Sequence, residues 1–341
     1  MASSSDKVRA VYNGTTYSGM LIDSSEQDVY LIKLDNGYNV GIPKKGTKLT
    51  TVGKIHEPKI IEEKQKINTA LPNISIVSTG GTITSRIDYR TGGVFPVSKP
   101  SELFTQIPEL NKIANISITS PFAILSEDMT PTHWSKLAGN VARELNKENV
   151  RGVIVTHGTD TLHYTAAALS FAFEDLGKPV ALVAGQRSSD RGSFDGAMNL
   201  ACGAHYATSD IAEVAIVMHA NSSDDYCIAN LGTKVKKMHT SMRNTFRPIN
   251  TLPLAKIYPN GKIEKLRECS LRHASKIKVE SRFEEKVALI KIHPGLSPKI
   301  LDYYAKEGYK GIILEGTGLG HVAATTWLTT IKSAIKKGIF I

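Results

Sequence analysis

The segment from Ile74 to Ile83, ISIVSTGGTI, constrains the fold more than any other part of the chain. Its β-branched start predicts a buried strand, and the adjacent Gly80 and Gly81 predict a sharp turn, because glycine readily adopts positive φ. Alone, this stretch could equally be a strand followed by an ordinary loop. Residues 151–160, RGVIVTHGTD, have the same design. Because open α/β sheets bind ligands at the carboxyl ends of their strands, the pair of turns favours a functional site.

Strands and helices alternate after about residue 73, which is typical of an α/β protein with a doubly wound, mostly parallel sheet. A helix is expected to begin near Thr130, with Pro131 in its first turn and an apolar face from Trp134 to Leu145. A second helix is expected over 161–176, ended by Gly177. The further strands expected are 180–184, 214–218, 287–292 and 311–314.

The first part of the chain has a different pattern. Four short alternating strands separated by turn residues predict a small antiparallel β-barrel over 1–53, with Pro43 ending the last strand. The charged, polar stretch 54–72 is expected to be a linker. The α/β domain would occupy 73–341. Its last residues, 336–341, have the pattern of a helix end followed by the start of a strand, so we expect the domain to be truncated there.

Composition narrows the class of protein. The 341 residues are 41% hydrophobic, enough for a substantial core, but no apolar run approaches the ~20 residues that span a bilayer. The first residues lack the apolar core of a signal peptide, and the three cysteines are scattered. We therefore expect a soluble, cytoplasmic protein without a zinc site. The net charge of +10 is compatible with an RNA partner, and equally with a generally lysine-rich composition.

The residues at the two strand ends suggest acyl chemistry. Two threonines, with Asp160 beside one of them, suit nucleophilic attack on an acyl carbon if another group accepts the proton. A lysine held by Asp160 could move that proton, and turn amides could stabilise an oxyanion. Lys234 and Lys237 are the candidates, although a solvated basic strand edge is the simpler interpretation of their segment. His157 could be an acid or base, or a neutral histidine bonded within its turn.

The polar turn after the third strand is a further candidate. Asp190, Arg191 and Asp195 lie in or beside the Gly-rich segment 185–192. Their charges suit ligand binding, and they suit a capped, salt-bridged loop equally well.

Two motifs together resemble the bacterial-type L-asparaginase family: TGGTI at 79–83 and THGTDT at 156–161, with similarity continuing through GIILEG at 311–316. The resemblance covers roughly residue 73 to the end. The roles that it implies are a primary nucleophile, Thr82; a lid tyrosine, Tyr89; a second threonine with its acidic neighbour, Thr159 and Asp160; substrate-binding positions, Gly81 and Ser126; and a catalytic lysine, Lys237 or alternatively Lys234. It implies no metal. Leu125 stands where many members have an acidic residue, which affects contacts to the donor's α-amino group.

The N-terminal barrel, the segment 88–92, the segment 185–191 and Lys237-Met238-His239 resemble one branch of that family, the ammonia-releasing subunit of archaeal glutamyl-tRNA(Gln) amidotransferases. This resemblance implies hydrolysis of glutamine or asparagine, with no cofactor bound by this chain. A partner, the GatE subunit of that enzyme, would use ATP and Mg to convert Glu-tRNA(Gln) to Gln-tRNA(Gln) and would make most tRNA contacts. A homodimer within a heterotetramer is implied. The alternatives are a free-standing L-asparaginase and an amide-binding protein that has lost catalysis.

Overall fold

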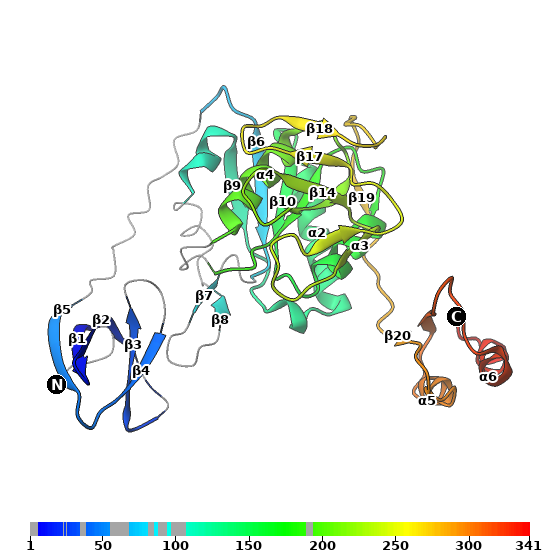
Figure 1. The fold of residues 1–341 in the computed structure, drawn as a ribbon. Helices are drawn as coiled ribbons and strands as arrows, with labels where there is room; N and C mark the ends of the chain where they lie inside the picture. The colour runs from blue at the N-terminus through cyan, green and yellow to red at the C-terminus, as the bar shows by residue number, and fades with distance from the viewer. Residues whose placement is uncertain are drawn as a thin grey trace. The chain divides into compact units, whose positions relative to one another are not determined.

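The computed structural model describes residues 6–22, 24, 26–34, 39–54, 68–80, 85–87, 94–96, 107–188 and 194–341 (Figure 1). The chain divides into two compact units: Met1–Met129 with Lys136–Ser281, and Thr130–Ser135 with Arg282–Ile341. Helix α2 begins in the second unit and continues into the first. Among the described residues, no helix combines the length and the apolar composition needed to cross a bilayer.

The N-terminal residues form a five-stranded antiparallel sheet in the order β4-β3-β2-β1-β5. Its strands are β1 (Asp6–Tyr12), β2 (Thr15–Ile22), β3 (Val29–Leu34), β4 (Asn39–Pro43) and β5 (Lys48–Lys54). Alternate residues supply a small core of Val8, Ala10, Leu21, Ile32 and Ile42. The expected all-β character is confirmed, but the sequence pattern missed β5. Its apolar residues, Leu49 and Val52, are three apart and cannot share one face of a strand.

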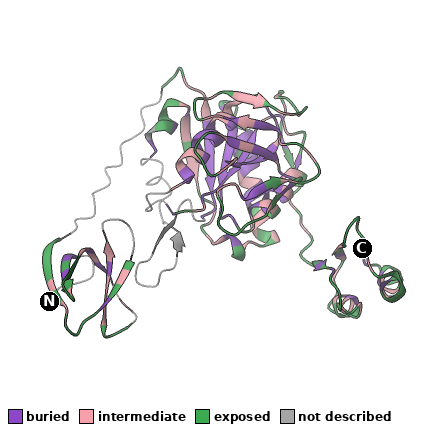
Figure 2. Cartoon of the chain, in the orientation of Figure 1, coloured by how far each residue is buried: buried purple, intermediate pink, exposed green. Residues whose placement is uncertain are grey.

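The main sheet has eight strands in the order β18-β17-β14-β13-β12-β10-β6-β9. The parallel strands are β6 (Asn73–Ser78), β9 (Asn115–Thr119), β10 (Val150–Thr156), β12 (Val180–Val183) and β13 (Val214–His219). The antiparallel strands are β14 (Cys227–Leu231), β17 (Ala255–Ile257) and β18 (Ile263–Lys265). The parallel strands are buried along most of their length (Figure 2), as their β-branched composition predicts. The α/β class is confirmed, with an antiparallel edge that was not predicted.

Helices cover both faces of this sheet. Ser75 and Ile76 are neighbours on β6, so their side chains point to opposite faces. The Ser75 hydroxyl donates to Glu144 of α2 (Pro131–Leu145) at 2.7 Å. Ile76 instead belongs to the core cluster that α4 (Gly196–Thr208) joins. This two-sided covering is the doubly wound arrangement that the alternation of strands and helices predicted.

The helix predicted over 161–176 is shorter. α3 spans Leu162–Ala172, and the next two residues form β11 (Phe173–Glu174), which pairs with β19 (Lys278–Val279). Asp175 then turns with a φ of 53° before Gly177. The chain thus leaves the helix before Gly177, because a strand from far along the sequence pairs with it.

Two short strand pairs and two 3-10 turns lie outside the main sheet. β7 (Ser85–Ile87) and β8 (Val94–Pro96) pair antiparallel, and β15 (Val235–Lys237) pairs with β16 (Phe246–Pro248). Two 3-10 turns, η2 (Pro108–Lys112) and η3 (Ser126–Asp128), flank β9. The residues between β7 and β8, where the lid was expected, lie outside the described ranges.

The second unit has its own core. β20 (Val287–Lys291) and β21 (Gly311–Glu315) pair in parallel, and α5 (Ile300–Lys306) and α6 (Ala324–Lys336) complete it. Buried residues include Ile290, Leu301, Ile312 and Trp327. After α6 the chain returns to the sheet, where Phe340 forms a parallel bridge with Gly311, in keeping with the predicted helix end and strand start.

Candidate active site

The first glycine-containing turn is fixed against the end of the neighbouring strand. β6 and β10 lie side by side, with Ser78 opposite Thr156. The backbone N–H and the hydroxyl of Thr79 both donate to the Thr156 carbonyl, at 3.0 and 2.9 Å. Thr79 is almost fully buried. The two glycine-containing turns therefore start from the same edge of the sheet, as the sequence predicted.

Gly80 is required by its backbone and its surroundings. Its φ is +98°, and it forms a parallel bridge with Ile124. A Cβ atom at this position would lie 2.6 Å from the Ile124 carbonyl oxygen. Only glycine fits both conditions. Gly81, Thr82 and Tyr89, the predicted binding glycine, nucleophile and lid tyrosine, lie outside the described residues.

Ser126 packs directly against the second turn. A Cβ at Gly158 would lie 2.7 Å from both Cβ and Oγ of Ser126, so glycine allows this close approach. The backbone N–H of Asp160 donates to Ser126 Oγ at 3.3 Å, and the Thr161 hydroxyl donates to the Ser126 carbonyl at 2.6 Å. The structure thus brings the predicted Ser126 into contact with the segment that carries Thr159 and Asp160. Leu125 directly precedes it, at the start of η3.

A lysine joins the second threonine and its acidic neighbour. Lys237 Nζ donates to Thr159 Oγ1 at 2.9 Å and to Asp160 Oδ1 at 2.6 Å. The Lys237 side chain is only 9% exposed, whereas the Asp160 side chain is 64% exposed. Thr159 is buried. The three groups form a continuous path from the interior to the surface.

Of the two candidate lysines, only Lys237 makes these contacts. It is the last residue of β15 and pairs with Phe246 of β16, which directs it toward the turn after β10. Lys234 lies just before β15 and is exposed. Its backbone N–H donates to Leu231 and its carbonyl accepts from Ile249.

The two histidines nearest this turn carry little positive charge. His157 is fully buried, and burial lowers its pKa to about 4. Its Nδ1 lies 2.7 Å from the Gly158 carbonyl and its Nε2 lies 2.9 Å from the Thr165 hydroxyl, so it fits a neutral imidazole within the turn. Burial, and then the charges of Lys236 and Lys237, lower the pKa of His163 to about 4 as well. Sequence reasoning missed His163, although it lies in the helix that directly follows the motif.

The polar turn after β12 is held by a buried carboxylate. Asp195 is 1% exposed and accepts the backbone N–H of Gln186 and of Arg187, each at 3.0 Å. It lies at the start of α4, where an anionic group is favourable. These contacts fit a capped loop. Asp190 and Arg191 lie outside the described residues.

The arrangement suits proton transfer to and from an acyl centre. An amine bonded to both a hydroxyl and a carboxylate can pass a proton between them, and buried donors keep their geometry during reaction. Within the described ranges, no group of three or more His, Cys, Asp or Glu side chains is placed to hold a metal ion.

Three family models match successive stretches: the GatD N-terminal domain at residues 2–52, the N-terminal asparaginase domain at 73–270 and the glutaminase/asparaginase C-terminal domain at 286–341. The GatD subunit of glutamyl-tRNA(Gln) amidotransferase from Pyrococcus horikoshii is 48% identical over 98% of this chain and 77% of its own length. The corresponding subunit from Archaeoglobus fulgidus is 43% identical over 98% of this chain and 79% of its own. The chain belongs to the GatD family of glutamyl-tRNA(Gln) amidotransferase subunits.

The fold of this member of the GatD family is similar to those of solved L-asparaginase structures. L-asparaginase I from Vibrio cholerae is 26% identical, with a TM-score of 0.68 and coverage of 80% of each chain. The thermostable L-asparaginase from Thermococcus kodakarensis is 24% identical, with a TM-score of 0.66 and coverage of 77% of each chain. The resemblance read from TGGTI and THGTDT is therefore confirmed at the level of both family and fold.

Proposed function

We propose that this chain hydrolyses the side-chain amide of glutamine or asparagine and supplies the ammonia to an amidotransferase reaction. The observation that carries the proposal is the Lys237 ammonium, which bonds at once to Thr159 and Asp160 within a largely buried path. Membership of the GatD family gives the amide-hydrolysing class of this enzyme.

In the proposed first step, the Thr82 oxygen attacks the amide carbon while its proton is taken up, and an acyl-enzyme ester forms. The carbon–nitrogen bond breaks, and the nitrogen leaves as ammonia once protonated. Backbone N–H groups of the turn at Gly81 would stabilise the charge on the oxygen. Tyr89 would close over the site, and Ser126 would hold the donor.

In the second step, water adds to the ester carbon and the bond to Thr82 breaks, which frees glutamate or aspartate and restores the hydroxyl. Thr159, Asp160 and Lys237, which are hydrogen-bonded to one another, would accept and return the water's proton. Each proton transfer would pass through Lys237, because its amine is bonded to both Thr159 and Asp160.

The proposed destination of the ammonia is Glu-tRNA(Gln). The relatives are named for that amidotransferase, and the GatD N-terminal domain is present here. In this proposal the partner, GatE, uses ATP and Mg to activate Glu-tRNA(Gln) and makes most of the tRNA contacts. This chain acts as a homodimer within a heterotetramer, in the cytoplasm. A free-standing L-asparaginase would have no evident use for the N-terminal sheet.

The test is a pair of lysine substitutions that differ only in position. Lys237→Met should lower ammonia release from glutamine by about 10²- to 10⁴-fold, the usual contribution of acid–base assistance. Lys234→Met, an equal change beside the same hairpin, should leave it near wild type. Thr82→Ala should nearly abolish release. Circular dichroism checks that each variant is folded.

Three outcomes would contradict the proposal. Normal hydrolysis by Lys237→Met or Thr82→Ala would remove the assigned roles. Steady hydrolysis that never feeds Gln-tRNA(Gln) synthesis, in a coupled assay with GatE, ATP and Glu-tRNA(Gln), would favour a free-standing asparaginase. Tight amide binding without turnover would favour a binding protein.

A further inference from the structure

The hairpin that carries Lys237 is too small to hold its own position. β15 and β16 form a separate two-stranded sheet with three paired residues on each side. An isolated pair of strands is at best marginally stable in water. Its base is fixed on the main unit, because Val235 and Phe246 are buried and the Asn230 amide nitrogen donates to the Phe246 carbonyl at 3.4 Å. Lys237 lies where β15 ends, so its direction toward Thr159 also depends on what fixes the loop between the strands, residues 238–245.

The loop is first closed on itself. The Met238 N–H donates to the Thr245 carbonyl at 2.9 Å, and the His239 N–H donates to Thr245 Oγ1 at 2.8 Å. His239 Nδ1 accepts the N–H groups of Ser241 and Met242, at 3.1 and 3.2 Å. These bonds give the loop one shape, so a force applied at its tip is transmitted to Lys237 at its base.

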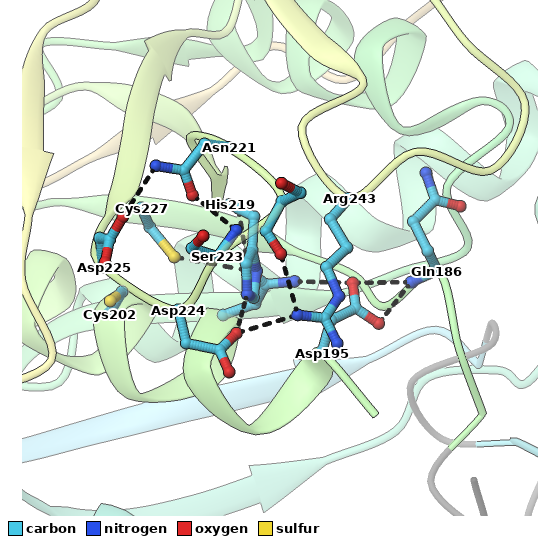
Figure 3. A network of polar contacts seen from close by, with 12 residues as sticks. Gln186, Asp195, Cys202, His219, Asn221, Ser223, Asp224, Asp225, Cys227 and Arg243 are labelled. Atoms are coloured by element: carbon cyan, nitrogen blue, oxygen red, sulfur yellow. Dashed lines mark hydrogen bonds and ion pairs between the residues drawn. The ribbon is translucent and has the colours of Figure 1, made fainter. Parts of the chain in front are cut away.

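The tip is then tied to the main sheet (Figure 3). Arg243 Nη1 donates to Asp224 Oδ1 at 3.1 Å and to the Ser222 carbonyl at 3.4 Å. From the other side, Gln186 Nε2 donates to the Met242 carbonyl at 3.1 Å. Two anchors therefore come from the segments that follow β12 and β13, on the same side of β10 in the order of the sheet.

Asp224 is itself held by the interior. His219, at the end of β13 and 2% exposed, lies with Nε2 at 2.9 Å from Asp224 Oδ1 and Nδ1 at 2.6 Å from Asn199 Oδ1. Asn199 is fully buried and its amide nitrogen donates to the Ala184 carbonyl at 2.8 Å, which fixes which way its side chain faces. The hydrogen bond from His219, and then the charge of Arg243, lower the pKa of Asp224. The carboxylate that Arg243 meets is thus kept ionised and in place.

We propose that Arg243 is a positioning residue for the hydrolysis: the series Asn199, His219, Asp224, Arg243 fixes the loop and so holds Lys237 in reach of Thr159 and Asp160. This inference rests on the proposed role of Lys237. Arg243 acts through the hairpin, by way of its bonds to Asp224 and to the Ser222 carbonyl. Because catalytic groups are sensitive to displacements of about 1 Å, a loosened loop lowers turnover.

The test uses the full chain and three substitutions, with kcat and KM for glutamine measured by ammonia release. Arg243→Met removes the guanidinium that donates both hydrogen bonds and should lower kcat about ten-fold or more, with KM changed by less than about two-fold. Arg243→Lys keeps a cation that can reach Asp224 and should recover most of kcat. Arg247→Met is the matched control, because Arg247 is an exposed residue of β16 on the same hairpin.

A wild-type kcat in Arg243→Met would overturn the inference, and so would an equal loss in Arg247→Met. A loss that Arg243→Lys does not recover, together with a lower urea midpoint, would show a structural role alone and would also overturn it. Lys237→Met is measured alongside. If it retains full activity, the proposed function fails; if it loses activity while Arg243→Met does not, only this inference fails.

Discussion

His157 is a neutral histidine built into the turn at the end of β10. It is fully buried, between the Gly158 carbonyl and the Thr165 hydroxyl, and burial lowers its pKa from 6.5 to about 4. Its position two residues before Thr159 suggests a role as general base. Its two short contacts instead join the turn to the first residues of α3, so its effect is expected on stability.

The stability of the first unit should therefore fall on acidification. Below pH 6.5 the unfolded chain takes up a proton at His157, whereas the folded chain does so only near pH 4. The free energy of unfolding then falls between those values, by about 3 kcal/mol in total, since a pKa difference of one corresponds to about 1.4 kcal/mol. Urea unfolding at pH 7.5 and 4.5 measures it.

His157→Gln provides the comparison. It should be less stable at pH 7.5 but should lose less stability on acidification than the wild type. Some pH dependence should remain, because the pKa of His163 is also about 4. If the variant and the wild type lose equal free energy between the two pH values, His157 is not the source.

The sequence predicted which residues lie at the strand ends, but not every contact between them. Thr159 and Asp160 could be predicted because they stand in a motif that ends an apolar strand, whereas Ser126 was expected only from the family resemblance. The choice between Lys234 and Lys237 could not be made, because it depends on where a short polar strand begins and pairs. Arg243 could not be predicted, because its bonds to Asp224 and Ser222 join two separate loops. His163 follows the motif in sequence, but its lowered pKa depends on its burial in the fold.

At the scale of elements, the strands that could be predicted have a local apolar pattern, whereas the missed strands depend on pairing with distant parts of the chain. The strands β6, β10, β12 and β13 are apolar runs, and this composition predicts their burial on both faces. The antiparallel strands from β14 to β18 are short and carry polar residues, so only their partners define them. The end of α3 likewise depends on β19, more than a hundred residues later in the chain.

Glycine-to-alanine substitutions in the turn after β6 and in α2 should have different effects on the free energy of unfolding. Gly80→Ala combines positive φ with a contact of 2.6 Å to the Ile124 carbonyl, and should destabilise the protein by roughly 2 kcal/mol or more. Gly139→Ala, within α2 and with nothing within 4 Å of the added carbon, should be neutral or stabilising by up to about 1 kcal/mol. Urea unfolding curves give both values.

The Gly80 substitution should also affect activity. The backbone it distorts leads directly to Gly81 and Thr82, so ammonia release should fall even under conditions in which the variant is fully folded. Equal stability in Gly80→Ala and Gly139→Ala would show that the turn relaxes around the added carbon and that its close approach to Ile124 does not require glycine.

At the scale of the whole molecule, the chain contains separate hydrophobic cores. One lies between the main sheet and α4, and another lies between the β20–β21 pair and α5 and α6. The sequence pattern does not mark this division, because residues 287–292 and 311–314 are apolar runs like those of the main sheet. What separates them is the pairing of strands, which no local pattern specifies.

Separate cores predict separate unfolding transitions, and the placement of the tryptophans makes this measurable. The chain has two, Trp134 and Trp327, and both belong to the second unit. Because α2, which carries Trp134, continues into the first unit, the reporter is Trp327 in a Trp134→Phe background. Its fluorescence reports on the second unit, whereas far-UV circular dichroism reports mostly on the larger first unit. Because a small core buries less surface, the fluorescence transition in urea should come at lower concentration.

Leu301→Ala in the same background tests whether the second core unfolds separately. Leu301 is fully buried within the second core, so this substitution should lower the fluorescence midpoint reported by Trp327 and leave the main circular dichroism transition in place. Coincident fluorescence and circular dichroism curves in the Trp134→Phe protein, shifted together by Leu301→Ala, would mean that the two units unfold as one. In that case the second core would stabilise the sheet that carries the active site, and substitutions in it would change ammonia release as strongly as stability.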